Sequence, residues 1–134
     1  MRAVLLSLVC LGLVGFYAHS VAAPAPLANI TITGNGKRGT KNCNGGVADI
    51  MGNKHVLTLK NCKKVTVQGN ANKLALKKCR RLDVLGNKNR VKAGKVKAIK
   101  ALGNHNTVLY KLGPKKKKPA ITNLGNHNTI KAVK

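Results

Sequence analysis

Acidic and aromatic residues are almost absent from this sequence. Its 134 residues include only two acids, Asp49 and Asp83, against 26 Lys or Arg residues. A paired-carboxylate hydrolase or a calcium site built from several acids is excluded, because both need more carboxylates. The aromatic residues are Phe16, Tyr17 and Tyr110. Base-specific reading of nucleic acid uses aromatic platforms or a helix in the major groove, and the sequence predicts neither.

Residues 1–22 have the pattern of a cleaved secretory signal peptide. A basic Arg2 precedes an apolar stretch at residues 4–16, and small residues follow at 20–22. The alternative is a retained membrane anchor, but the apolar stretch is shorter than the ~20 residues that a span needs. The sequence therefore predicts a secreted, extracellular protein. Loss of Arg2 lowers its formal net charge from +24 to +23.

Cysteine is scarce in the predicted mature chain. Cys10 leaves with the signal peptide, so Cys43, Cys62 and Cys79 remain. An odd number of cysteines in a secreted chain leaves at least one free or intermolecular thiol. No Cys-x-x-Cys pair is present and no His accompanies the cysteines, so neither a metal site nor another cofactor is predicted.

A Gly-Asn pair recurs at a nearly fixed interval. Four copies, from Gly52 to Gly103, begin 17 residues apart, and outer copies begin at Gly34 and Gly125. The later copies lengthen to Gly-Asn-x-Asn. A fixed period of this length is typical of repeat architectures. We expect one repeat domain over residues 34–134, preceded by a lead-in and first strand at 23–33.

Each repeat contains two pairs of apolar residues separated by a polar one. The pairs that follow each Gly are Leu57/Leu59, Leu74/Leu76, Val91/Ala93, Val108/Tyr110 and Ile130/Ala132. Similar pairs precede each Gly, as in Val65/Val67 and Leu82/Val84. A period of two indicates strands. Because so short a unit buries its apolar side only by stacking, the pattern predicts an all-β, single-domain parallel β-solenoid of about six coils with two short strands each.

The turn residues and cysteines follow the same period. Gly permits positive φ, Asn tolerates the left-handed region, and stacked Asn side chains are expected to form an amide ladder. Cys62 and Cys79 occupy equivalent positions one coil apart, with Cys43 near that position in the first coil. The spacing of adjacent strands permits a Cys62–Cys79 or a Cys43–Cys62 disulfide, and a column of buried thiols is the alternative.

Two segments interrupt the repeat. Residues 36–46 lack the first apolar pair, which predicts a frayed or looped first coil. Residues 113–119 form a basic insertion that is expected to bulge as a surface loop, and its Lys run resembles a nuclear-localisation signal. In a secreted protein such a signal would matter only after entry into a host cell. The sequence shows no dedicated cap after the last repeat, so end-to-end self-association is expected as one behaviour.

The basic residues also recur by position. Because almost no acids are interleaved, solubility alone explains this pattern poorly, and we expect a polyanion-binding surface. Nucleic acid, acidic polysaccharide and an anionic membrane surface fit equally well. The expected binding residues are Lys60, Lys63, Lys64, Lys77, Arg80, Arg81, Lys97, Lys115, Lys116, Lys117 and Lys118.

The Gly-Asn-x-Asn repeats with their following apolar pairs resemble a family of small secreted proteins classed as a domain of unknown function. The resemblance extends from Gly34 to Lys134. It implies a β-solenoid and brings no established activity.

The expected function is that of a secreted, cationic, non-enzymatic protein that engages polyanions, with effector or antimicrobial action as a consequence. An extracellular or cell-wall structural protein is the alternative. A small ribonuclease is a third reading, in which His105 and His127, at the same turn position one coil apart, share acid and base roles. Asn29 begins the only Asn-x-Ser/Thr glycosylation sequon of the mature chain.

Overall fold

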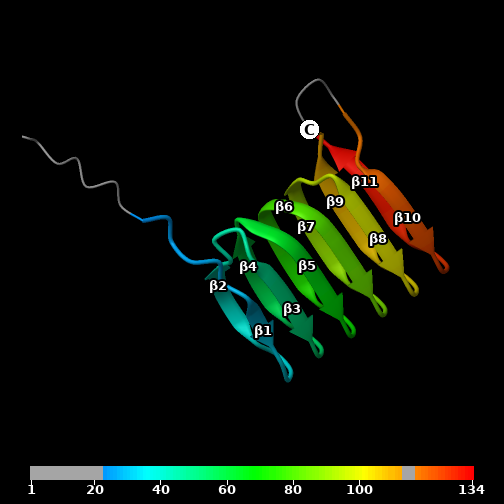
Figure 1. Cartoon of the computed structure of the whole chain (residues 1–134). Coiled ribbons are helices and arrows are strands. Elements are labelled where there is room, and N and C mark those ends of the chain that lie inside the picture. Colours follow the sequence, from blue (N-terminus) through cyan, green and yellow to red (C-terminus); the bar gives the residue numbers. More distant parts are fainter. Residues whose placement is uncertain (1–22, 113–116) are drawn as a thin grey trace, which may run out of the picture.

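The computed structural model describes residues 23–112 and 117–134. The predicted signal peptide at residues 1–22, and with it the route of secretion, lies outside the described residues. The described part contains eleven strands and no helix, and therefore no helix long and apolar enough to cross a membrane. The strands wind into a stack of coils (Figure 1).

Two parallel sheets form the walls of this stack. Sheet A contains β1 (Ile30–Ile32), β3 (Val47–Met51), β5 (Cys62–Gln68), the second half of β6 (Lys73–Leu85), β8 (Ala98–Leu102) and β10 (Ala120–Leu124). Sheet B contains β2 (Arg38–Asn42), β4 (Val56–Lys60), the first half of β6, β7 (Arg90–Lys95), β9 (Thr107–Lys111) and β11 (Thr129–Val133). β6 passes through both sheets and joins them.

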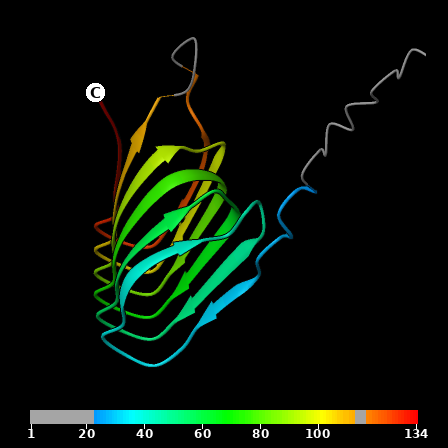
Figure 2. The same cartoon turned by 90° about the vertical axis from the view of Figure 1, so that its left-hand side faces the viewer.

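The alternating apolar pairs face each other across the interior. From sheet A, residues such as Val65, Leu82 and Ile99 are buried in one cluster with residues of sheet B such as Leu57 and Val91. Figure 2, turned by 90°, shows the two walls enclosing this narrow interior. The predicted parallel β-solenoid with two strands per coil is confirmed. The chain completes about five turns between β1 and β10, and β11 begins the sixth.

The Gly-Asn turns form one edge of the solenoid, here called the Gly-Asn edge (residues 34–37, 52–55, 69–72, 86–89, 103–106 and 125–128). They make a row of tight bends in Figure 1. Gly86 has a φ of 117°, and a Cβ on it would overlap the carbonyl oxygen of Gly69 one coil earlier. Glycine is thus required at position 86 for two reasons, its positive φ and the closeness of the preceding coil.

The asparagine ladder is present, but its details differ from the prediction. The residue after the Asn, such as Lys88, adopts the left-handed conformation with φ of 57°, and Asn87 does not. The Asn87 Oδ1 accepts a hydrogen bond from the backbone N–H of Asn104 in the next coil at 2.9 Å. Its Nδ2 donates to the Asn70 Oδ1 of the preceding coil at 3.1 Å, so the side chain links the coils on both sides, as expected of an amide ladder.

The second Asn of each motif forms a buried ladder that the sequence analysis did not assign. Asn89 is 1 % exposed, donates from Nδ2 to the Gly69 carbonyl at 2.8 Å, and accepts from the Asn72 N–H at 3.0 Å. His55 takes this place in the second coil, where its Nδ1 accepts from the Lys37 N–H at 3.1 Å. These bonds satisfy backbone groups that bend away from the strand ladders.

The first coil is more regular than predicted. Residues 38–42 form β2, which pairs in register with β4, although all five residues are exposed. The prediction of a frayed or looped segment is therefore wrong for these residues. Backbone pairing with a well-packed neighbouring strand forms the strand here without inward apolar side chains.

Candidate polyanion-binding edge

The edge opposite the Gly-Asn turns is built from a three-residue pattern with an apolar residue in the middle. Its members are Asn61-Cys62-Lys63, Lys78-Cys79-Arg80 and Lys95-Val96-Lys97, here called the basic edge. In each triplet the middle residue is buried and both neighbours are exposed, as expected where extended chain alternates inward and outward side chains. The burial of the apolar column therefore forces its basic neighbours outward.

Stacking of the coils turns these triplets into two rows of cations. Lys78 and Lys95 are partners in the pairing of β6 with β7, and form the row before the apolar column. Lys63, Arg80 and Lys97 form the row after it. Successive coils lie about 4.8 Å apart, and residues two apart in extended chain about 6–7 Å. Like charges at this spacing repel one another, so the arrangement costs stability.

A groove with a volume of about 1080 Å³ runs over this edge. Seven cations and no carboxylate line it, and its apolar lining comes from the middle column and Leu27 of the lead-in. The cations are Lys63, Lys78, Arg80, Lys95, Lys97, Lys117 and Lys118. Because no acid offsets these charges, the groove presents a field of one sign to solvent.

A disulfide braces the groove at its N-terminal end. Cys43 and Cys62 are bonded, with Cα atoms 4.9 Å apart, and Cys79 is free. The Cys62–Cys79 alternative and the column of three thiols are therefore both wrong in this structure. Both neighbours of Cys62 lie at strand distance, and in this structure its sulfur bonds the one nearer the N-terminus.

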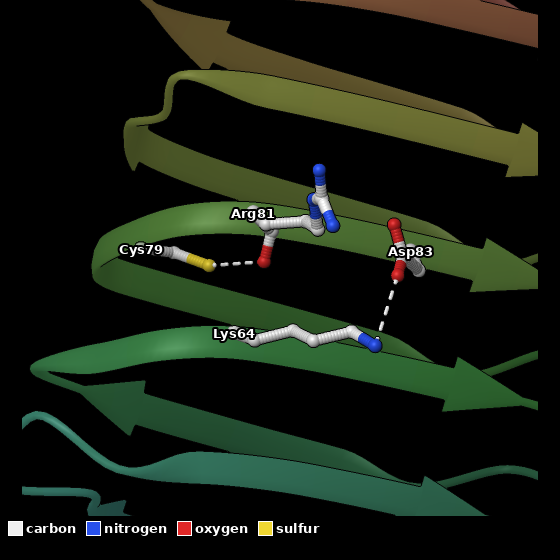
Figure 3. A network of polar contacts seen from close by, with 4 residues as sticks. All are labelled: Lys64, Cys79, Arg81 and Asp83. Atoms are coloured by element: carbon white, nitrogen blue, oxygen red, sulfur yellow. Dashed lines mark hydrogen bonds and ion pairs between the residues drawn. The ribbon is translucent and has the colours of Figure 1, made fainter.

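The free thiol of Cys79 is an inert part of the interior. Its Sγ lies 2.9 Å from the carbonyl oxygen of Arg81 (Figure 3). Burial, with a smaller contribution from the Asp83 carboxylate, raises the pKa of Cys79 to about 11. The thiol is accordingly protonated at neutral pH and a poor nucleophile.

The predicted binding residues separate into four groups. Lys63, Arg80, Lys97, Lys117 and Lys118 come together in the groove. Lys60 and Lys77, two residues before Cys62 and Cys79, lie exposed beside the groove and do not line it. Lys115 and Lys116 lie outside the described residues.

Lys64 and Arg81 are on the outer face of sheet A rather than in the groove. Their strands pair at these residues, and the Lys64 Nζ lies 3.4 Å from the Asp83 carboxylate (Figure 3). This ion pair joins an exposed amine to a partly buried carboxylate, and it offsets the positive charge of Lys64. The Asp83 carboxylate makes this face less suited to a polyanion than the groove.

Two groove residues were absent from the predicted set. Lys78 and Lys95 stand nine residues after Gly69 and Gly86, whereas the predicted residues of the coils stand eight, eleven or twelve residues after their Gly. In extended chain the neighbours of an inward residue point outward, so the column of Cys62, Cys79 and Val96 carried the missing signal. A bulge between Ala93 and Lys95 brings Lys95, and with it the row of Lys78 and Lys95, into register with Lys111 of β9.

The histidines of the third reading lie on the other edge. The rings of His105 and His127 stack with centroids 4.9 Å apart and planes 8° from parallel. Both side chains are exposed.

Within residues 23–112 and 117–134, no three His, Cys, Asp or Glu side chains gather into a group that could hold a metal ion. The sequon residue Asn29 is exposed, and its Oδ1 accepts from the Val47 N–H at 3.3 Å.

Repeated coils, two continuous parallel sheets and paired asparagine ladders define the protein as a parallel β-solenoid. Residues 50–92 and 67–127, together more than half of the chain, match the family described as Protein of unknown function (DUF3060), and the chain belongs to this family. No curated protein and no solved structure matches the chain significantly.

Proposed function

We propose that this protein binds polyanions through the basic edge and does so without catalysis. The observation that carries the proposal is the groove lined by seven cations and no carboxylate. Isolated surface lysines are ordinary, but rows of them held at coil spacing cost stability. A ligand that neutralises the rows recovers this cost and releases bound counterions.

The expected site of action is the extracellular space, because residues 1–22 resemble a signal peptide. Binding there would be driven by the charged backbone of the partner and would weaken steeply with salt. Effector or antimicrobial activity would follow from capture of an anionic polymer or surface.

The test is retention of the mature protein on immobilised heparin and DNA across a salt gradient. We expect retention at low salt and release at moderate salt. A variant with Lys63→Glu, Arg80→Glu and Lys97→Glu should lose retention, because three charges of one row are reversed. The control carries the same charge change at Lys54, Lys88 and Lys100, which lie on the Gly-Asn edge and sheet A, and should stay retained.

Equal loss in both triple variants would contradict the proposal, because it would show a response to net charge alone. A particle size that grows with protein concentration and ignores salt would instead favour an extracellular structural role. Cleavage of RNA that disappears in His127→Ala, with RNA binding retained, would favour the ribonuclease reading.

A further inference from the structure

We infer that the groove takes a single extended chain of an acidic polysaccharide, lying along the solenoid axis, in preference to nucleic acid. This inference rests on the proposed function and narrows its partner. Three features favour such a chain: the straight cation rows, the apolar column between them, and a groove lining without Phe, Tyr or Trp.

The rows are straight because each coil repeats the one before. Lys78 and Lys95 are register partners, and Lys63, Arg80 and Lys97 repeat at the same coil position. Phosphates of a DNA duplex instead wind around its axis, so a straight row meets only a few of them. A straight, flexible chain with regularly placed acids contacts every coil of the groove.

Two rows separated by an apolar strip match the shape of an extended acidic glycan. In a twofold extended chain, successive rings turn their acidic groups to alternate sides and leave the C–H faces of the rings between them. The groove offers cations on both sides of Cys79 and Val96, with the aliphatic stems of the lysines adding apolar surface. The acidic groups of the glycan therefore meet the cations, and its C–H faces meet the apolar strip.

The composition of the groove disfavours single-stranded nucleic acid. Proteins that bind single strands stack bases on aromatic side chains, and Tyr110, the aromatic residue of the described part, is 4 % exposed and faces the interior. Six of the seven groove cations are lysines, and Arg80 is the exception. Lys is a point charge that pairs with carboxylate, sulfate or phosphate alike, so the discrimination against single strands comes from the lack of an aromatic platform in the groove.

The groove is also better suited to a polymer than to a membrane surface. Its cations surround a concave strip on one edge, and Lys117 and Lys118 are among the lining residues. The exposed apolar residues Ile121 and Leu124 lie on β10, outside the groove lining. A flat bilayer would reach the outer amines and leave the apolar strip without a partner.

The test is a titration of the mature protein with polygalacturonate, an oligothymidylate, duplex DNA and phosphatidylglycerol vesicles at equal charge and salt. The methyl ester of polygalacturonate is titrated at equal sugar concentration. We expect the polyuronate to bind at least about tenfold more tightly than either nucleic acid or the vesicles, and the uncharged ester to bind weakly. Sulfated glycan in a parallel titration separates sulfate from carboxylate as the preferred acid.

Lysine acetylation read by mass spectrometry locates the bound chain without relying on a variant. We expect polygalacturonate to protect Lys63, Lys78, Lys95 and Lys97, and to leave Lys54 reactive. Nucleic acid or vesicles that bind as tightly as the polyuronate would overturn the glycan inference and leave the proposed function standing. Binding to none of the anions would overturn both, and protection confined to the Gly-Asn edge would overturn the assigned site.

Discussion

The chain passes from one sheet to the other at both edges of the solenoid, but the two edges do this with different residues. On the Gly-Asn edge, each coil reverses through Gly, Asn, a left-handed residue and a second polar residue, which is His55 in one coil and Asn in later coils. On the basic edge, the chain runs extended through Lys78-Cys79-Arg80 and bends at Asn61 and Lys97 in the neighbouring coils. These residues surround a buried apolar column that contains one disulfide and one free thiol. On the Gly-Asn edge the polar side chains hydrogen-bond the backbone, whereas on the basic edge the amines face solvent.

This difference separates structure from function within one repeat. The asparagines of the Gly-Asn edge hydrogen-bond backbone groups of neighbouring coils, so few of their groups remain for a ligand. Amines of the basic edge have no carboxylate beside them in the groove. Substitutions on the first edge should therefore change stability, and substitutions on the second should change binding.

The largest effect is expected for Gly86→Ala. Its Cβ would overlap the Gly69 carbonyl, and its φ of 117° is strained for Ala. We expect a loss of about 3 kcal/mol or more in the free energy of unfolding, measured with urea. Gly36→Ala is the control, because it has a positive φ and open space around it, and should cost about 1 kcal/mol. Equal costs would show that close packing of the coils does not matter.

Loss of the disulfide should come next. Cys43→Ser opens a bridge between residues separated by 19 positions, which should lower the free energy of unfolding by about 3 kcal/mol. Alkylation of unreduced, unfolded protein should label Cys79 alone. Labelling of Cys43 instead would assign the bridge to Cys62 and Cys79.

The buried and exposed asparagine ladders should differ in strength. Asn89→Ala leaves the Gly69 carbonyl and the Asn72 N–H without their side-chain partner in a buried place, and should cost about 2–3 kcal/mol. Asn87→Ala exposes its partner to water and should cost about 1 kcal/mol. Urea unfolding of both variants measures the difference, and a larger loss for Asn87 would contradict the assigned burial.

A further stability effect, smaller than the loss of the disulfide, concerns alkaline pH. Because the pKa of Cys79 rises from 9.0 to about 11 on folding, its contribution is complete below pH 9 and is lost as pH rises toward 11. Relative to Cys79→Ala, the native protein should lose about 2 kcal/mol over this window. Comparing the two proteins cancels the titration of the many lysines. Parallel pH profiles would show that the thiol is not buried.

The repeating features of the sequence predicted the fold, whereas contacts that depend on which neighbouring coil a residue faces were not predicted. Period and alternation were sufficient for the solenoid, because inward pairs such as Leu74 and Leu76 have no other place to be buried. The bonding partner of Cys62 was not predictable, because both alternatives lie one coil away. Counting from each Gly found Lys63 and Arg80 but missed Lys78, whose exposure follows from the burial of its neighbour Cys79.

The salt dependence of polyanion binding tests the central claim most directly. The slope of log K against log salt is negative, where K is the association constant for the polyanion. In the variant that combines Lys63→Gln, Arg80→Gln and Lys97→Gln, the magnitude of this slope should decrease by about 2 to 3, because three charges no longer displace counterions. Neutralising Lys54, Lys88 and Lys100 in the same way should leave the slope unchanged. Equal slopes for the two triple variants would contradict the assignment of binding to the basic edge.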